Sequence, residues 1–156
     1  MKISLTINGK KIEVEDAAEQ PLLYFLRGDL GLTRTRYGCG SGSCGSCMVI
    51  VDGSAVQSCD MPLSAAHGSS IETAEALNQE DIVHPILKAL NQLQAAQCGY
   101  CISGITMSAK ALLDKNIKPT RAEIVEALDF NLCRCGAHLR IIDAIDLAAS
   151  EMRGDS

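Results

Sequence analysis

The stretch YGCGSGSCGSC, residues 37–47, sets three cysteines and four glycines within eleven residues. Such a run has neither the period of a helix nor the alternation of a strand, so it predicts a loop. Glycine lets a backbone approach a bound group closely and take conformations that other residues avoid. Three interpretations are open from this stretch alone: a disulfide knot, a zinc loop, or a cradle for another group.

The rest of the chain indicates in which cellular compartment the protein works. It has 156 residues, enough for one ordinary domain or two small ones. No apolar run reaches the roughly 18 residues of a spanning helix, so we expect no direct membrane insertion. The opening MKISLTINGKKIEVE lacks the apolar core of a secretory signal. We therefore expect a cytoplasmic protein, which a partner is able to bring to a membrane.

Charge and aromatic content argue against nucleic acid as a partner. The net charge is −5, and the chain has three tyrosines, two phenylalanines and no tryptophan. Nucleic-acid binding relies on basic patches and aromatic stacking platforms. An ordinary solvated surface explains the acidity.

Eight cysteines are many for a chain without a signal. Reducing compartments disfavour structural disulfides, so such cysteines more often bind metal or do redox chemistry. They fall into two groups of four, one in each half of the chain: Cys39, Cys44, Cys47 and Cys59, then Cys98, Cys101, Cys133 and Cys135.

The first group has the spacing C-x4-C-x2-C-x11-C. Its opening matches the plant-type pattern for a [2Fe–2S] cluster. A loop around such a cluster turns backbone N–H groups toward sulfur, which the interspersed glycines permit. Zinc also takes four cysteines, but usually as two separate pairs. The spacing favours a cluster over zinc.

The second group has the spacing C-x2-C-x31-C-x-C. The first pair alone fits zinc, a cluster or thioredoxin-like chemistry. Two cysteines one residue apart do not share a helix face, so Cys133 and Cys135 belong at a turn or helix end. Helices are expected after both pairs, and helix N-termini favour thiolates. A cluster is again favoured over zinc.

The two halves also differ in their structural patterns. Alternating apolar residues from Ile3 and the turn signals Asn8-Gly9 and Asp52-Gly53 predict strands and hairpins. After about residue 82, apolar residues recur at helical spacing in four segments, and Thr120 begins a capping box. We predict an α+β chain with domains at 1–75 and 76–156, joined by a connector at 74–82. The four short helices of the second half suggest a small bundle.

Together the motifs YGCGSGSCGSC with Cys59, QCGYC (97–101) and NLCRC (131–135) resemble the small iron–sulfur subunit of the xanthine oxidase family of molybdenum hydroxylases. The resemblance runs from about residue 3 to residue 150. It implies a ferredoxin-like β-grasp domain followed by a four-helix bundle, each holding one [2Fe–2S] cluster.

The resemblance also implies roles for single residues. The cluster of Cys98, Cys101, Cys133 and Cys135 would lie nearer molybdopterin, and the other nearer the electron acceptor. Gln97 and Cys135 match the family's contacts to the pterin. No residue of this chain is expected to be catalytic. Hydroxylation would occur in a large molybdopterin subunit, with the pterin as its cytosine dinucleotide, and electrons would leave to FAD or haem in a flavin or cytochrome subunit.

Departures from the family's common motifs indicate which branch of the family this chain resembles. Two other functions stay open as alternatives. QCGYCISG, NLCRCGAH and GSCGSC look most like enzymes that oxidise N-heterocyclic aromatics such as nicotinate or isoquinoline, with aldehydes as the other substrate class. A freestanding two-cluster ferredoxin or redox sensor is the first alternative, and a zinc-stabilised module is the second. The three histidines are interpreted as structural or solvated, with His138 nearest the second cysteine group. Ser43 and Ser46 have no assigned role.

Overall fold

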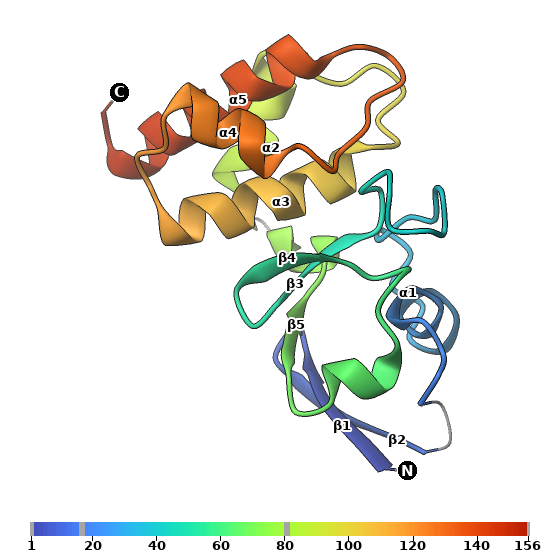
Figure 1. Cartoon of the computed structure of the whole chain (residues 1–156). Coiled ribbons are helices and arrows are strands. Elements are labelled where there is room, and N and C mark those ends of the chain that lie inside the picture. Colours follow the sequence, from blue (N-terminus) through green and yellow to red (C-terminus); the bar gives the residue numbers. More distant parts are fainter. Residues whose placement is uncertain (1, 16–17, 80–81, 156) are drawn as a thin grey trace.

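The computed structural model describes residues 2–15, 18–79 and 82–155. A β-sheet with its N-terminal strand forms one end of the molecule, and a layer of helices forms the other (Figure 1). The predicted α+β class is confirmed. The finer assignments, a β-grasp sheet and a four-helix bundle, stay predictions.

Five strands make the main sheet in the order β2-β1-β5-β3-β4. Both predicted turns occur, since β1 pairs antiparallel with β2 around Asn8-Gly9 and β3 with β4 around Asp52-Gly53. β5 closes the sheet between them, parallel to β1 and antiparallel to β3. The strands are β1 (Lys2–Ile7), β2 (Lys10–Glu15), β3 (Met48–Val51), β4 (Ser54–Gln57) and β5 (Ser70–Glu72).

Burial follows the alternation that the sequence shows. Ile3, Leu5 and Ile7 of β1 point into one core, which the short helix α1 (Leu22–Tyr24) and the π-helical turn Phe25–Asp29 cover. Pro21 precedes α1 as its N-cap residue. Val49 and Val51 of β3, the strand that follows the first cysteine loop, belong to the same core.

Four helices make the second half, and side chains from all of them share one hydrophobic core. The capping box at Thr120 is present, because its side chain accepts from Glu123 N and Glu123 accepts from Thr120 N. The helices are α2 (Pro85–Gln92), α3 (Ile102–Lys115), α4 (Arg121–Ala127) and α5 (His138–Arg153).

The predicted connector is more structured than the sequence suggested. It holds a 3-10 helix, Ala74–Leu77, and a two-stranded ribbon of β6 (Asn78–Gln79) and β7 (Ile82–Val83), while positions 80 and 81 lie outside the described residues. Ala74 and Leu77 are buried against α3 and β3 in a third core cluster. This segment therefore belongs to the contact between the two halves.

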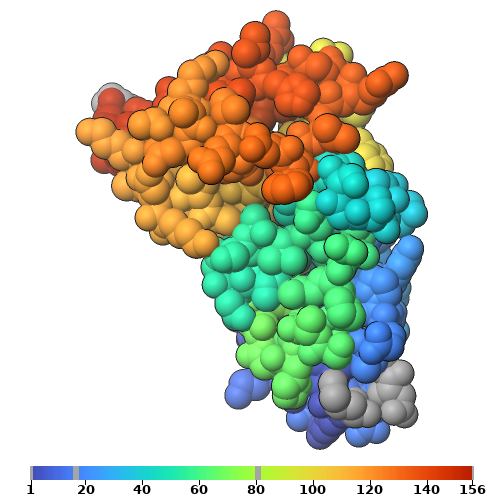
Figure 2. All heavy atoms as spheres, viewed as in Figure 1, coloured from blue at the N-terminus to red at the C-terminus, as the bar shows by residue number. Residues whose placement is uncertain are grey.

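That contact is broad and fixes the halves against each other. α3 packs over β3 (Figure 1), and Lys110 of α3 forms an ion pair with Glu72 of β5 at 3.0 Å. The space-filling view shows the loop of residues 37–47, in cyan, next to the helical half (Figure 2). No helix within the described ranges is long and apolar enough to cross a membrane.

Candidate metal centres

The loop of residues 37–47 turns its backbone amides toward sulfur. Ser41 N and Ser43 N donate to Cys39 Sγ at 3.4 and 3.2 Å, and Cys39 N donates to Cys44 Sγ at 3.3 Å. Gly42 N donates to Cys59 Sγ at 3.4 Å. The structure thus brings this loop and Cys59, twelve residues after Cys47, to one place.

These amides and burial act on the thiols in opposite directions. Hydrogen bonds from Ser41 and Ser43 lower the pKa of the Cys39 thiol to about 6. Burial raises the pKa of the Cys59 thiol to about 12, and contact with Cys47 adds to that rise. An exposed thiol is therefore prepared as a thiolate, whereas a buried one ionises only beside a compensating cation.

The second group shows the same contrast. The Tyr100 N–H, 3.5 Å from Cys98 Sγ, lowers the pKa of the Cys98 thiol, and contact with the Cys135 thiol adds to this. Burial raises the pKa of the Cys101 thiol to about 12, where it contacts Cys133. Burial opposes ionisation of Cys133, but backbone N–H groups beginning with Ala137 hold its pKa below the ordinary value.

A helix follows each cysteine pair of this group, as the sequence predicts. Cys101 is the N-cap residue of α3, and its side chain makes no capping hydrogen bond. Cys133 and Cys135 lie in the turn before α5, which begins at His138. Both pairs therefore adjoin a helix start, where the helix dipole favours negative charge.

The two cysteine groups meet at one junction. Leu132, the residue before Cys133, donates its N–H to the Cys44 carbonyl at 2.9 Å. A hollow of about 220 Å³ between the groups is lined by residues of both, including Cys39, Cys44, Cys98 and Cys101. No local pattern in the sequence indicates this direct bond between the loops.

Small residues make the junction close. A Cβ at Gly104 of α3 would lie 2.0 Å from the Gly45 carbonyl oxygen, and a Cβ at Gly45 would lie 2.2 Å from the Phe130 carbonyl oxygen. Beside them the buried Asn131 donates from Nδ2 to Gly45 O at 3.3 Å and accepts from Ser108 Oγ at 2.8 Å.

Arg36 makes a second bridge between the groups. Arg36 directly precedes the first cysteine loop in sequence. Its guanidinium donates to Gly99 O at 2.6 Å in the other half and lies 5.0 Å from the centre of the Tyr100 ring. Tyr100 in turn donates its hydroxyl to the Tyr37 carbonyl. A cation is thus held against the turn between Cys98 and Cys101.

The other predicted site residues also have definite surroundings. Gln97 is exposed, and its Nε2 donates to the Cys135 carbonyl at 3.4 Å, so the two predicted pterin contacts lie together. Ser46 is buried with its Oγ 3.5 Å from Cys44 Sγ, whereas Ser43 is exposed and donates to Ser41 O.

The histidines fit structural or solvated roles. His67 accepts from Ser4 N at 3.1 Å, and His84 caps α2 by accepting from Ile86 N at 3.2 Å. His138 is exposed at the start of α5.

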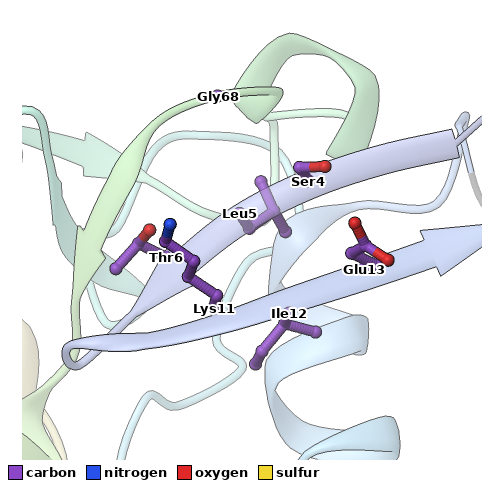
Figure 3. A pocket seen from close by; sticks show the side chains of 7 residues that line it. All are labelled: Ser4, Leu5, Thr6, Lys11, Ile12, Glu13 and Gly68. Carbon is purple, nitrogen blue, oxygen red and sulfur yellow. The ribbon is translucent and has the colours of Figure 1, made fainter.

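A separate hollow of about 270 Å³ along the β1–β2 hairpin is lined by strand residues and Gly68, and no cysteine lines it (Figure 3).

The donor set fits [2Fe–2S] clusters. Eight free thiols in two convergent groups, with amides aimed at four of the sulfurs in the first group, suit an anionic cluster that needs N–H donors around it. Among the described residues, no group of three or more histidine, cysteine, aspartate or glutamate side chains is arranged to hold a single metal ion.

Comparison with known proteins gives two family matches that together span most of the chain. Residues 5–79 match the 2Fe-2S iron-sulfur cluster binding domain, and residues 73–146 match the [2Fe-2S] binding domain. Each half is therefore similar to a cluster-binding family in its own right.

Two curated relatives match over nearly their whole length. The chain is 48% identical to one of the subunits of nicotinate dehydrogenase from Pseudomonas putida, covering 97% of this chain and 96% of that protein. It is 39% identical to the nicotinate dehydrogenase small FeS subunit of Eubacterium barkeri, covering 94% and 93%. The solved aldehyde oxidoreductase from Desulfovibrio gigas matches with a TM-score of 0.94 at 36% identity, covering 100% of this chain and 18% of that one.

Proposed function

Because this chain belongs to the small iron–sulfur subunits of the xanthine oxidase family of molybdenum hydroxylases, we propose that it relays electrons from molybdopterin in a large subunit to a flavin or cytochrome acceptor. Its relatives are subunits of oxidoreductases, so the chain is an electron-transfer subunit of such a complex, with larger partners. We assign the substrate to the N-heterocyclic aromatics or aldehydes, the classes that the relatives' names contain.

Eight thiols would hold the clusters in this function. We assign Cys98, Cys101, Cys133 and Cys135 to the cluster nearer the molybdopterin, and Cys39, Cys44, Cys47 and Cys59 to the cluster nearer the acceptor. Gln97 and Cys135 would contact the pterin. When bound, each [2Fe–2S] cluster takes up and gives up one electron at a time.

The protein's own residues supply the surroundings. Amides around Cys39 and Cys44 stabilise negative charge on sulfur, which raises a cluster's reduction potential. The Cys44–Leu132 hydrogen bond is the observation that best supports the proposed relay, because it links the backbones of the two cysteine loops directly.

Exposed apolar side chains favour a role within a complex over a freestanding ferredoxin. Phe130, Leu132 and Leu139 flank the CxC pair in sequence and are 62%, 61% and 71% exposed. Apolar surface gathered at one site usually marks an interface. The large molybdopterin subunit would cover this face, beside Gln97.

Two measurements test the proposal. The native protein should be coloured and contain iron and acid-labile sulfide, and it should show two distinct [2Fe–2S] signals in electron paramagnetic resonance (EPR) when reduced. It should also copurify with a large protein that contains molybdopterin. If the product were colourless and held zinc, the clusters would be refuted. A stable two-cluster monomer that never associates with a molybdopterin protein would support the ferredoxin alternative.

A further inference from the structure

The buried amide of Asn131 stands where three elements meet. It is 5% exposed and lies two residues before Cys133. One of its hydrogen bonds reaches the first cysteine loop at Gly45, and the other reaches α3 at Ser108. A single side chain thus ties together both cysteine loops and the helix that begins after Cys101.

The hydrogen bonds fix how the amide is turned. Gly45 contributes a carbonyl oxygen, which accepts and never donates, so Nδ2 must face it and Oδ1 must face the Ser108 hydroxyl. Burying an amide is costly unless its hydrogen bonds are satisfied. Here they are satisfied only while the loop, the CxC turn and α3 keep these relative positions.

The neighbouring contacts make the arrangement sensitive to small displacements. Gly45 O also accepts from Met48 N at 3.2 Å, so it is held at the loop's exit into β3. Gly104 of α3 packs so closely against the same carbonyl oxygen that a Cβ would not fit between them. A shift of the Gly45 peptide would move Cys44 and Cys47 on either side of it.

We propose that Asn131 is a positioning residue that sets the placement of one cluster relative to the other, by holding the Gly45 peptide against α3 beside the CxC turn. This inference rests on the proposed function, because it needs both clusters in place. It assigns the relative geometry of the clusters to a side chain that ligates neither.

The test uses the complete chain with its clusters loaded. Two reduced clusters split each other's EPR lines, and the splitting depends on their separation and orientation. Measured at alkaline pH, where the introduced carboxyl is ionised, Asn131→Asp keeps the size of the side chain and the acceptor for Ser108 but removes the donor to Gly45. We expect it to keep iron and sulfide while the splitting is lost or clearly altered. Intercluster electron transfer, followed by pulse radiolysis, should slow several-fold.

Two further variants separate positioning from folding. Asn91→Asp makes the same chemical change at an exposed position on α2, and its splitting should equal that of the unaltered protein. Ser108→Ala keeps the bond to Gly45 but breaks the amide's link to α3, so it should alter the splitting measurably, although less than Asn131→Asp does. Unchanged splitting in a cluster-loaded Asn131→Asp protein would overturn the inference.

If Asn131→Asp fails to hold its clusters, Ser108→Ala decides: a splitting identical to that of the unaltered protein would then overturn the inference as well. A failure of the proposed function looks different, because the unaltered protein would then lack the two [2Fe–2S] signals altogether.

Discussion

Gly104→Ala tests the contact on which the junction between the halves depends. The added Cβ would lie 2.0 Å from Gly45 O, a backbone atom, so neither side can relieve the overlap by rotating a side chain. Overpacking of this kind costs ~1–3 kcal/mol, and a backbone clash this short belongs at the upper end. Alanine in a helix returns up to about 1 kcal/mol relative to glycine. The expected net loss is about 2 kcal/mol.

Urea unfolding of the cluster-loaded chain measures this loss. With a slope of about 2 kcal/mol per M, the midpoint should fall by about 1 M. Gly28→Ala is the matched control, because a Cβ there meets no atom within 4 Å and the backbone needs no positive φ. That variant should be neutral or slightly stabilised. If Gly104→Ala unfolded at the same urea concentration as Gly28→Ala, the close approach of α3 to the loop would not be what holds the halves together.

Three other changes test separate parts of the site. Cys135→Ala should abolish one [2Fe–2S] signal in EPR and preserve the other; loss of both signals, or of neither, would contradict two independent sites. Arg36→Gln removes the cation held against Gly99 and Tyr100, so the midpoint potential of the second cluster should fall and that of the first should change less. A redox titration monitored by EPR measures both potentials, and Arg34→Gln, at an exposed position, is the control. Burial lowers the pKa of His84 below its usual value of about 6.5, so the unfolded chain binds the proton more readily and stability is lost as pH falls below about 6.5. His84→Asn keeps an N-cap acceptor but does not titrate, so its thermal unfolding temperature should fall less on acidification. An equal fall would assign the pH dependence to other groups.

Local patterns were enough to predict much of this chain. Cysteine spacing separated the two groups, and turn signals placed the hairpins at Asn8-Gly9 and Asp52-Gly53, because each depends on residues adjacent in sequence. The capping box at Thr120 is local in the same way. The cluster ligands and the pterin contacts at Gln97 and Cys135 stay predictions, although the structure brings each set together.

Contacts between distant residues were beyond such reasoning. The segment after Thr73 reads as a polar connector, since its few apolar residues show no clear period. Ala74 and Leu77 are buried only because Met107 and Ala111 of α3 meet them from about thirty residues away. Arg36 gave no signal either, because its partners at Gly99 and Tyr100 lie in the other half.

The division between local and distant contacts follows the division of labour in the site. Each cysteine loop is shaped mostly by its own amides, as Ser41 and Ser43 do for Cys39, so each pattern is visible in a short stretch. A relay needs more than two good loops, because the electron must cross from one to the other. That step depends on Gly45, Gly104 and Asn131, which come from three separate segments and ligate nothing. Variants that preserve all eight cysteines can therefore still impair transfer, and the junction is the place to look for them.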